Sequence, residues 1–415
     1  MPFSLTANKP KRYRIFSPIR DFLADSRSTG ILLIGCTAIS IVITNTSTGG
    51  WYHRLWNTEN NSLTSWGLPG SLLEWINNFL MAFFFVLAAT EIKRELLNGE
   101  LSTVKKAILP FGAALGGMLV PALIFIAFNF HTAYRHGWGI PTATDIAFSL
   151  GAASLLGKRF PVGLKILLMA LAIIDDLGAI LVIALFYGGN IHWQYLGMSG
   201  LIYGFLWLMN LMKIKFSMVQ VVLGFFLWYL MLQSGVEAAI SGVLFAFVMP
   251  VDALAQIEKK IHKIVNFGIL PLFALANTAI LFPADVLGAM NTSVGMGIAF
   301  GLVIGKPLGI FLVSRAMVAL NLAHLPTNVR WNQLLGMGML AGIGFTMSIF
   351  TTMLAFGDES FRDVAKISIL TAVVASVLIS YLYFRAIGVV KHVSVPVATL
   401  PLTEQSVAEQ QLANI

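Results

Sequence analysis

The sequence predicts an all-α polytopic membrane protein with about twelve transmembrane helices. Of its 415 residues, 57% are hydrophobic and only 11% are charged, whereas a soluble domain has about 25% charged residues. The apolar runs are continuous, which indicates helices and not the alternating strands of a barrel. The net charge of +8 is explained by basic cytoplasmic loops, so we expect no nucleic-acid partner.

The chain divides into three expected segments. Residues 1–27 form a basic cytoplasmic segment, in which RIFSPIRDFLADS could be a short amphipathic surface helix. Residues 28–388 form the transmembrane domain, and residues 389–415 form a cytoplasmic tail that we expect to be disordered. The expected spans are 30–48, 72–92, 107–128, 140–157, 161–187, 195–212, 217–234, 236–250, 267–283, 294–320, 334–356 and 366–388.

The basic residues predict the orientation in the membrane. With both termini in the cytoplasm, twenty-two lysines and arginines fall on the cytoplasmic side and four on the outside. Lys306, inside a span, completes the 27. This bias follows the positive-inside rule and supports an even number of spans.

Two of the expected spans are internally interrupted. The span at 140–157 is short and opens with Pro141, Thr142, Thr144 and Asp145. The span at 334–356 carries four glycines in its first half: Gly336, Gly338, Gly342 and Gly344. Interrupted spans in matching halves of a chain are typical of inverted-repeat transporters and indicate the binding site. We expect spans three to five and ten to twelve to be the repeat pair.

Two adjacent carboxylates, Asp175 and Asp176, lie near the middle of the span at 161–187. A charge at that depth costs at least about 2.5 kcal/mol, so this pair predicts an ion or proton site facing a polar cavity. Consecutive helical residues point about 100° apart. One aspartate can therefore bind an ion while the other pairs elsewhere. The alternative is a pair of buried acids that only hold helices together, although apolar residues would do this at lower cost.

Sodium prefers oxygen ligands, which Asp175, Asp176, Thr144 and freed backbone carbonyls supply. Burial disfavours the charged form of a carboxylate, so such a group can hold either H⁺ or Na⁺ near neutral pH. Competition for one site that opens to one side at a time is an antiport mechanism. If two protons replace one Na⁺, net charge moves, and each charge couples to the membrane potential at about 2.3 kcal/mol per 100 mV.

Two further ionisable residues lie within spans. Asp145, where the span at 140–157 unwinds, would be stabilised by positive half-helix N-termini. Lys306 has the opposite sign and suits half-helix C-termini or a pairing with Asp175 or Asp176. The alternatives are an ordinary N-cap for Asp145 and, for Lys306, a side chain that reaches the interface.

A second group of ionisable residues is expected at the cytoplasmic side. Glu91, Arg94 and Glu95 lie at the end of the second span. Glu258 and His262, four residues apart in an expected cytoplasmic loop, could share one helical face. The ordinary pKa of histidine makes His262 a candidate pH sensor; the alternative, favoured by the sequence alone, is a plain solvated loop. Gly112/Gly116 and Gly301/Gly305 predict ordinary close helix contacts.

The chain resembles the NhaA family of bacterial Na⁺/H⁺ antiporters from about residue 28 to residue 388. The motifs that carry the resemblance are LMALAIIDDLGAI, IPTATDIAFSLG, LPLFALANTA, IGKPLGI, GIGFTMSIF, EIKREL, NLAHLP and WYH. The resemblance implies twelve helices, with discontinuous helices four and eleven crossing near mid-membrane.

The resemblance also implies roles for individual residues. Asp175 and Asp176 would form the cation and proton site with Thr144, and Asp145 and Lys306 would compensate charge at the helix crossing. Glu91, Arg94, Glu95, Glu258 and His262 would form a pH-response cluster. Lys259 and Asn78 depart from the family pattern, where a histidine and an acid are familiar, so the pH set point is open.

The resemblance further implies the setting of the activity. It predicts an electrogenic, pH-regulated Na⁺(Li⁺)/H⁺ antiporter of the bacterial inner membrane, with no cofactor, the bilayer and small cations as partners, and a homodimeric state. Three rivals remain. A Na⁺-coupled symporter would need a larger polar cavity, an aspartyl protease would need two acids that share a proton, and a channel would arrange its charges as a ring.

Overall fold

The computed structural model of the chain describes residues 26–99, 101–283, 285–326 and 329–388. In these ranges all regular secondary structure is helical, with no β-strand. The helices are long and apolar, so the predicted fold, an all-α polytopic membrane protein, is confirmed. Nearly all of the expected amphipathic helix at 14–26, and the expected disordered tail at 389–415, lie outside the described residues.

Five uninterrupted apolar helices are long enough to cross a bilayer. At 25 to 29 residues each, they reach at least about 37 Å, more than the roughly 30 Å of a hydrocarbon core. They are Leu72–Asn98 (α5, Leu72–Glu74; η1, Trp75–Leu80; α6, Met81–Asn98), α7 (Val104–Asn129), α9 (Val162–Phe186), Ser293–Ala319 (α16, Ser293–Phe300; η5, Gly301–Gly305; α17, Lys306–Ala319) and α20 (Glu359–Ile387).

Two further spans are bent. α18 (Trp331–Ala341) and α19 (Phe345–Ala355) meet at 48°, so the predicted interruption of this span is confirmed. α2 (Ser26–Thr44) is followed after a turn of 116° by α3 (Gly49–Asn57) and α4 (Asn61–Thr64). Counting each bent pair as one span gives up to seven spans by length and composition within the described residues.

The other expected spans correspond to shorter helices, and the count of twelve therefore stays a prediction. The span at 140–157 is divided into η2 (Ala133–Thr142) and α8 (Ile146–Leu155), with η3 (Gly157–Arg159) after it. The remaining helices are α10 (Trp193–Leu211), α11 (Met218–Ser234), α12 (Ile240–Val248), α13 (Val251–Ile264), η4 (Val265–Ile269), α14 (Leu270–Asn277) and α15 (Val286–Met290).

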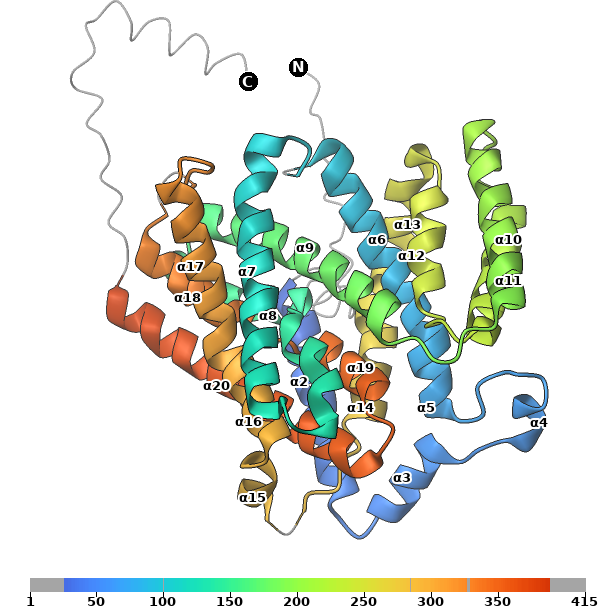
Figure 1. Cartoon of the computed structure of the whole chain (residues 1–415), viewed down its shortest axis with the longest axis horizontal. Coiled ribbons are helices and arrows are strands. Elements are labelled where there is room, and N and C mark those ends of the chain that lie inside the picture. The colour runs from blue at the N-terminus through green and yellow to red at the C-terminus, as the bar shows by residue number, and fades with distance from the viewer. Residues whose placement is uncertain (1–25, 100, 284, 327–328, 389–415) are drawn as a thin grey trace, which may run out of the picture.

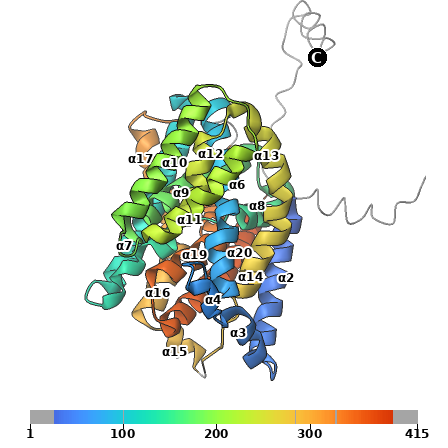
Figure 2. The same cartoon turned by 90° about the vertical axis from the view of Figure 1, so that its right-hand side faces the viewer.

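The helices form two neighbouring groups with α9 slanting between them (Figure 1). α10 and α11 pack side by side at one edge of the molecule and both contact α12; Figure 2 shows this side face on. On the other side of α9, α7 packs along α16 and α17. The aspartate pair lies in the middle of α9 and is therefore buried between the two groups.

Small residues let α7 and α17 approach closely. A Cβ atom at Gly116 would lie 2.3 Å from the carbonyl oxygen of Gly309, and one at Gly309 would lie 2.0 Å from that of Gly116. Gly112 faces Met317 in the same contact. The glycine spacing predicted as an ordinary helix contact therefore brings two backbones together.

One element differs from its expected form. Glu258 and His262 were assigned to a cytoplasmic loop, but both lie on helix α13, which continues through η4 into α14. The segment QIEKKIHK is amphipathic, with apolar residues four apart. This spacing predicts a helix and outweighs the polar composition, which suggested a loop. The segment is therefore helical and not a loop, its two residues share one helix as their spacing allows, and His262 is exposed.

Candidate functional site

The two interruptions, at residues 143–145 and 342–344, lie against each other; we call them the paired breaks. The Asp145 backbone N–H donates a hydrogen bond to the Ile343 carbonyl at 2.7 Å. The Thr144 hydroxyl lies 2.8 Å from the Ala341 carbonyl oxygen and 2.7 Å from Oδ2 of Asp175, and its one hydrogen serves one of them at a time. The breaks free the backbone groups that a continuous helix would satisfy internally.

Asp145 accepts hydrogen bonds at the N-termini of the two half-helices that begin at the paired breaks. Its Oδ1 accepts from the Phe148 N–H at 2.9 Å, at the start of α8. Its Oδ2 accepts from the Thr346 N–H at 3.1 Å and from the Thr346 hydroxyl at 2.6 Å, at the start of α19. Asp145 is thus an N-cap, as the alternative proposed, and it also faces two positive helix ends.

Lys306 binds the C-terminal end of a half-helix. Its Nζ donates to the carbonyl of Thr142, the last residue of η2. Nζ also forms an ion pair with Oδ2 of Asp175 at 2.7 Å, and both side chains are fully buried. The side chain therefore does not reach the interface, and of the two expected partners it takes Asp175.

A wide helical turn precedes Lys306. In η5 the Lys306 N–H donates to the carbonyl of Gly301, five residues back, and Pro307 has no N–H to continue the pattern. A Cβ atom at Gly301 would lie 2.8 Å from Cβ of Pro141 in η2. This close approach places Lys306 beside the end of η2. Such π turns are frequent at functional sites.

The two adjacent aspartates have different surroundings, as their helical spacing predicts. Asp175 faces Lys306 and Thr144. Asp176 instead lines a cavity of about 300 Å³, together with Thr144, Asp145 and Thr346. Asp176 is only 4% exposed, and its buried Oδ1 accepts no hydrogen bond from the described residues. It is therefore a carboxylate with an oxygen free to bind a cation or a proton.

The cavity connects Asp176 with the expected pH-response residues. Glu91 and Arg94 of α6 and Glu258 and His262 of α13 also line it. Arg94 forms ion pairs with Glu258 and, at 3.5 Å, with Glu95. Four of the five residues, from two distant segments, thus line one cavity, and Glu95 joins them through Arg94.

Two residues of this region were not predicted as site residues. Thr346 binds Asp145, and Asn266, which donates to the His262 ring at 3.1 Å, lines the cavity. Thr346 is the second residue after the glycine-rich break, and this position, close to the break as Asp145 is to the other, could have indicated it. Nothing in the sequence distinguishes Asn266 from other polar residues at helix ends.

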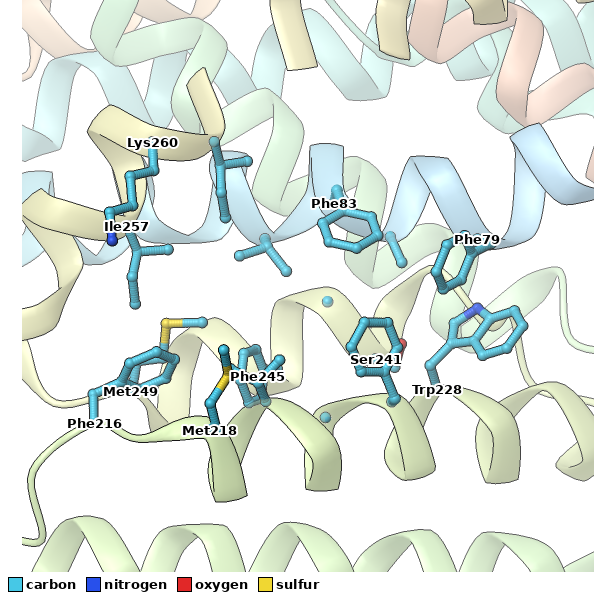
Figure 3. A pocket seen from close by; sticks show the side chains of 17 residues that line it. Phe79, Phe83, Phe216, Met218, Trp228, Ser241, Phe245, Met249, Ile257 and Lys260 are labelled. Atoms are coloured by element: carbon cyan, nitrogen blue, oxygen red, sulfur yellow. The ribbon is translucent and has the colours of Figure 1, made fainter. Parts of the chain in front are cut away.

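A larger apolar groove lies elsewhere. It has a volume of about 340 Å³ between α6, α11, α12 and α13, and Phe79, Phe83, Trp228 and Phe245 line it (Figure 3). Lys260 is the one charged residue that lines it. None of the predicted site residues lines this groove, so it is separate from the carboxylate cavity.

The sequence is similar to those of known proteins. Residues 20–384 match the profile of the family described as Na⁺/H⁺ antiporter 1. The chain belongs to this family. It is similar to the "Na(+)/H(+) antiporter NhaA" of Flavobacterium psychrophilum, with 45% identity over 375 residues that cover 89% of this chain and 96% of the relative. The NhaA of Escherichia coli O139:H28 is 42% identical over 88% of this chain and 97% of its own length. The family resemblance read from the motifs is confirmed.

Proposed function

We propose that this protein is a bacterial membrane antiporter that extrudes Na⁺ in exchange for H⁺, with Asp176 as the residue that binds either ion. Membership of the antiporter family supports the exchange of sodium and protons. The observation that supports the site is the buried carboxylate of Asp176, with an unpaired oxygen, at the inner end of a polar cavity. Such a group can exchange a proton for a hard cation without any resident cofactor.

Thr144 and Asp145 complete the proposed site. Both line the cavity with Asp176, and the Thr144 hydroxyl adds a neutral oxygen to the two carboxylates. Because these ligands are oxygens, we propose that Li⁺ is a second substrate. Asp145 also keeps the two half-helix N-termini neutral, so the cation meets no excess positive charge there.

We propose that the exchange is electrogenic. Asp176 carries one proton, and the Asp175–Lys306 pair carries a second, which belongs to the pair as a unit because the two groups are 2.7 Å apart. Exchange of two protons for one Na⁺ moves one net charge. An imposed membrane potential, with no pH gradient, should therefore drive Na⁺ across the membrane.

The test is proton movement in everted vesicles. Cells that express the chain and lack other Na⁺/H⁺ antiporters should give vesicles whose respiration-driven pH gradient collapses on addition of NaCl or LiCl. A pH-sensitive dye reports this between pH 6.5 and 8.5, and KCl is the control salt. If NaCl leaves the gradient intact at every pH, the proposed exchange is wrong; uptake of Na⁺ only with an organic solute would indicate a symporter.

We further propose that the cluster of Glu91, Arg94, Glu95, Glu258 and His262 sets the pH response. Glu258→Gln removes one negative charge and the ion pair with Arg94. The remaining groups then hold their protons less strongly, and the pH of half-maximal exchange should fall by on the order of 1 unit. Exchange rates measured against pH check this.

The matched control for this prediction is Asp252→Asn, which removes the same charge from an exposed position of the same helix. It should leave the pH profile of exchange unchanged. Equal shifts for both variants would show that surface charge alone causes the effect, and no shift for Glu258→Gln would remove Glu258 from the pH response.

The setting of the protein remains a proposal as well. From the loop charges we place the chain in the inner membrane with both termini in the cytoplasm. The cluster at the mouth of the cavity would then face the cytoplasm. The homodimeric state stays a prediction from the family resemblance.

A further inference from the structure

The outer half of the interrupted fourth span is an unusual helix. η2 is a 3₁₀ helix of ten residues, Ala133–Thr142. Such helices seldom exceed three or four residues because their hydrogen-bond geometry is poor. η2 leads directly into Thr144 and Asp145, and its last carbonyl, that of Thr142, accepts from Lys306. Its position therefore decides where the ligands of the proposed site lie.

Side chains from three other helices hold the carbonyls of η2. The Tyr187 hydroxyl at the end of α9 donates to the His136 carbonyl at 2.6 Å. The Ser348 hydroxyl of α19 donates to the Ile140 carbonyl at 2.7 Å. Lys306 of α17 holds the third carbonyl, at the inner end. These bonds supply from outside part of the support that a 3₁₀ helix of this length lacks.

The Tyr187 hydroxyl both donates a hydrogen bond to η2 and accepts one from it. It accepts from the Gly139 N–H at 3.0 Å, and a Cβ atom at Gly139 would lie only 2.7 Å from this oxygen. Beside it, Trp138 of η2 packs edge-on against Phe186 of α9, with ring centroids 5.1 Å apart. A tyrosine phenol is neutral at physiological pH, so the group remains a hydrogen-bond donor.

Ser348 connects η2 with the second interrupted span. It is fully buried, and it lies two residues after Thr346, which binds Asp145. α19 therefore contacts both sides of the break at 143–145, through Ser348 on the outer side and Thr346 on the inner side. α9 does the same, through Tyr187 at its end and Asp175 in its middle.

We propose that Tyr187 and Ser348 are positioning residues that hold η2 in place, so that the Thr142 carbonyl and the Thr144 hydroxyl keep their positions when the Asp175–Lys306 pair changes its protons. This inference rests on the proposed antiport. Lys306 can hold η2 only while it is paired as in this structure. The two hydroxyls bind backbone carbonyls whose charge does not change, so they hold η2 throughout the cycle.

The experiment compares full-length variants reconstituted into proteoliposomes. Ser348→Ala removes one hydrogen bond to η2 and should raise the half-saturating Na⁺ concentration about fivefold. Tyr187→Phe removes two and should raise it at least as much. The maximal rate should stay within about twofold, because the proton-carrying groups are untouched. The double variant should exceed either single one. Melting temperatures in detergent show that each variant is folded.

The matched control is Tyr229→Phe. This tyrosine also donates to a backbone carbonyl, that of Trp66 at 3.0 Å, but it lies on α11, away from the paired breaks. It should keep the wild-type half-saturating concentration. The inference is overturned if Tyr187→Phe and Ser348→Ala bind Na⁺ as the wild type does, or if only their maximal rates fall. A wild type without Na⁺-dependent exchange would instead overturn the proposed function itself.

Discussion

Replacing Asp176 by asparagine is expected to abolish Na⁺-driven proton movement in everted vesicles at every pH. Asparagine keeps the shape of the side chain but can neither neutralise a cation nor carry a proton between pH 6.5 and 8.5. Two carboxylates that line the cavity have an unpaired buried oxygen, Asp176 and Glu258. Glu258 pairs with Arg94, whereas Asp176 has no basic partner among the described residues. Its loss therefore removes the exchanging group itself.

Asp285→Asn is the control for this substitution. Asp285 caps the short helix α15 by accepting a hydrogen bond from the Gly288 N–H. It does not line the carboxylate cavity, so its variant should exchange Na⁺ as the wild type does. Exchange that persists in Asp176→Asn would move the cation site to Asp145 or Asp175.

The second large effect is expected at Lys306. Lys306→Gln leaves Asp175 as a fully buried carboxylate without its ion partner, and the loss of one partner of a buried pair costs about 3–5 kcal/mol. The Thr142 carbonyl loses its charged donor as well. We therefore expect a marked fall in the melting temperature of the purified protein, measured in detergent by the fluorescence of its tryptophans.

The double variant Lys306→Gln, Asp175→Asn distinguishes the cause. It removes both charges, so most of the lost stability should return if the unpaired Asp175 charge is responsible. Arg315→Gln, a control on the same helix whose guanidinium stacks on Trp331 at 4.6 Å, should shift the melting temperature only slightly. A double variant as unstable as Lys306→Gln would show that Lys306 acts through packing and not through its charge.

Much of the fold follows directly from the sequence. The spans at 107–128 and 161–187 agree with α7 and α9 to within a few residues, because long apolar runs between basic loops leave few alternatives. The interruption shortly after Pro141 and the one at the glycines of 334–356 also follow from local backbone chemistry. The different surroundings of Asp175 and Asp176 follow from helical geometry alone.

Other features depend on contacts between distant segments. No local pattern brings Glu258 to Arg94, and only the family resemblance indicated that they belong together. The carbonyls of η2 accept hydrogen bonds from Tyr187 and Ser348, which lie 51 and 208 residues from their partners. The many charged residues of α13 favoured a loop in the sequence analysis. They lie on one face of an amphipathic helix.

The central claim is the exchange of Na⁺ for H⁺ at Asp176. Its most direct test is uptake of ²²Na⁺ by proteoliposomes that contain the purified protein, with an acidic interior, an alkaline exterior and the membrane potential held at zero. We predict that the pH gradient drives Na⁺ accumulation above equilibrium in the wild type and not in Asp176→Asn. Uptake that is independent of the pH gradient, or equal in the two proteins, would contradict the account.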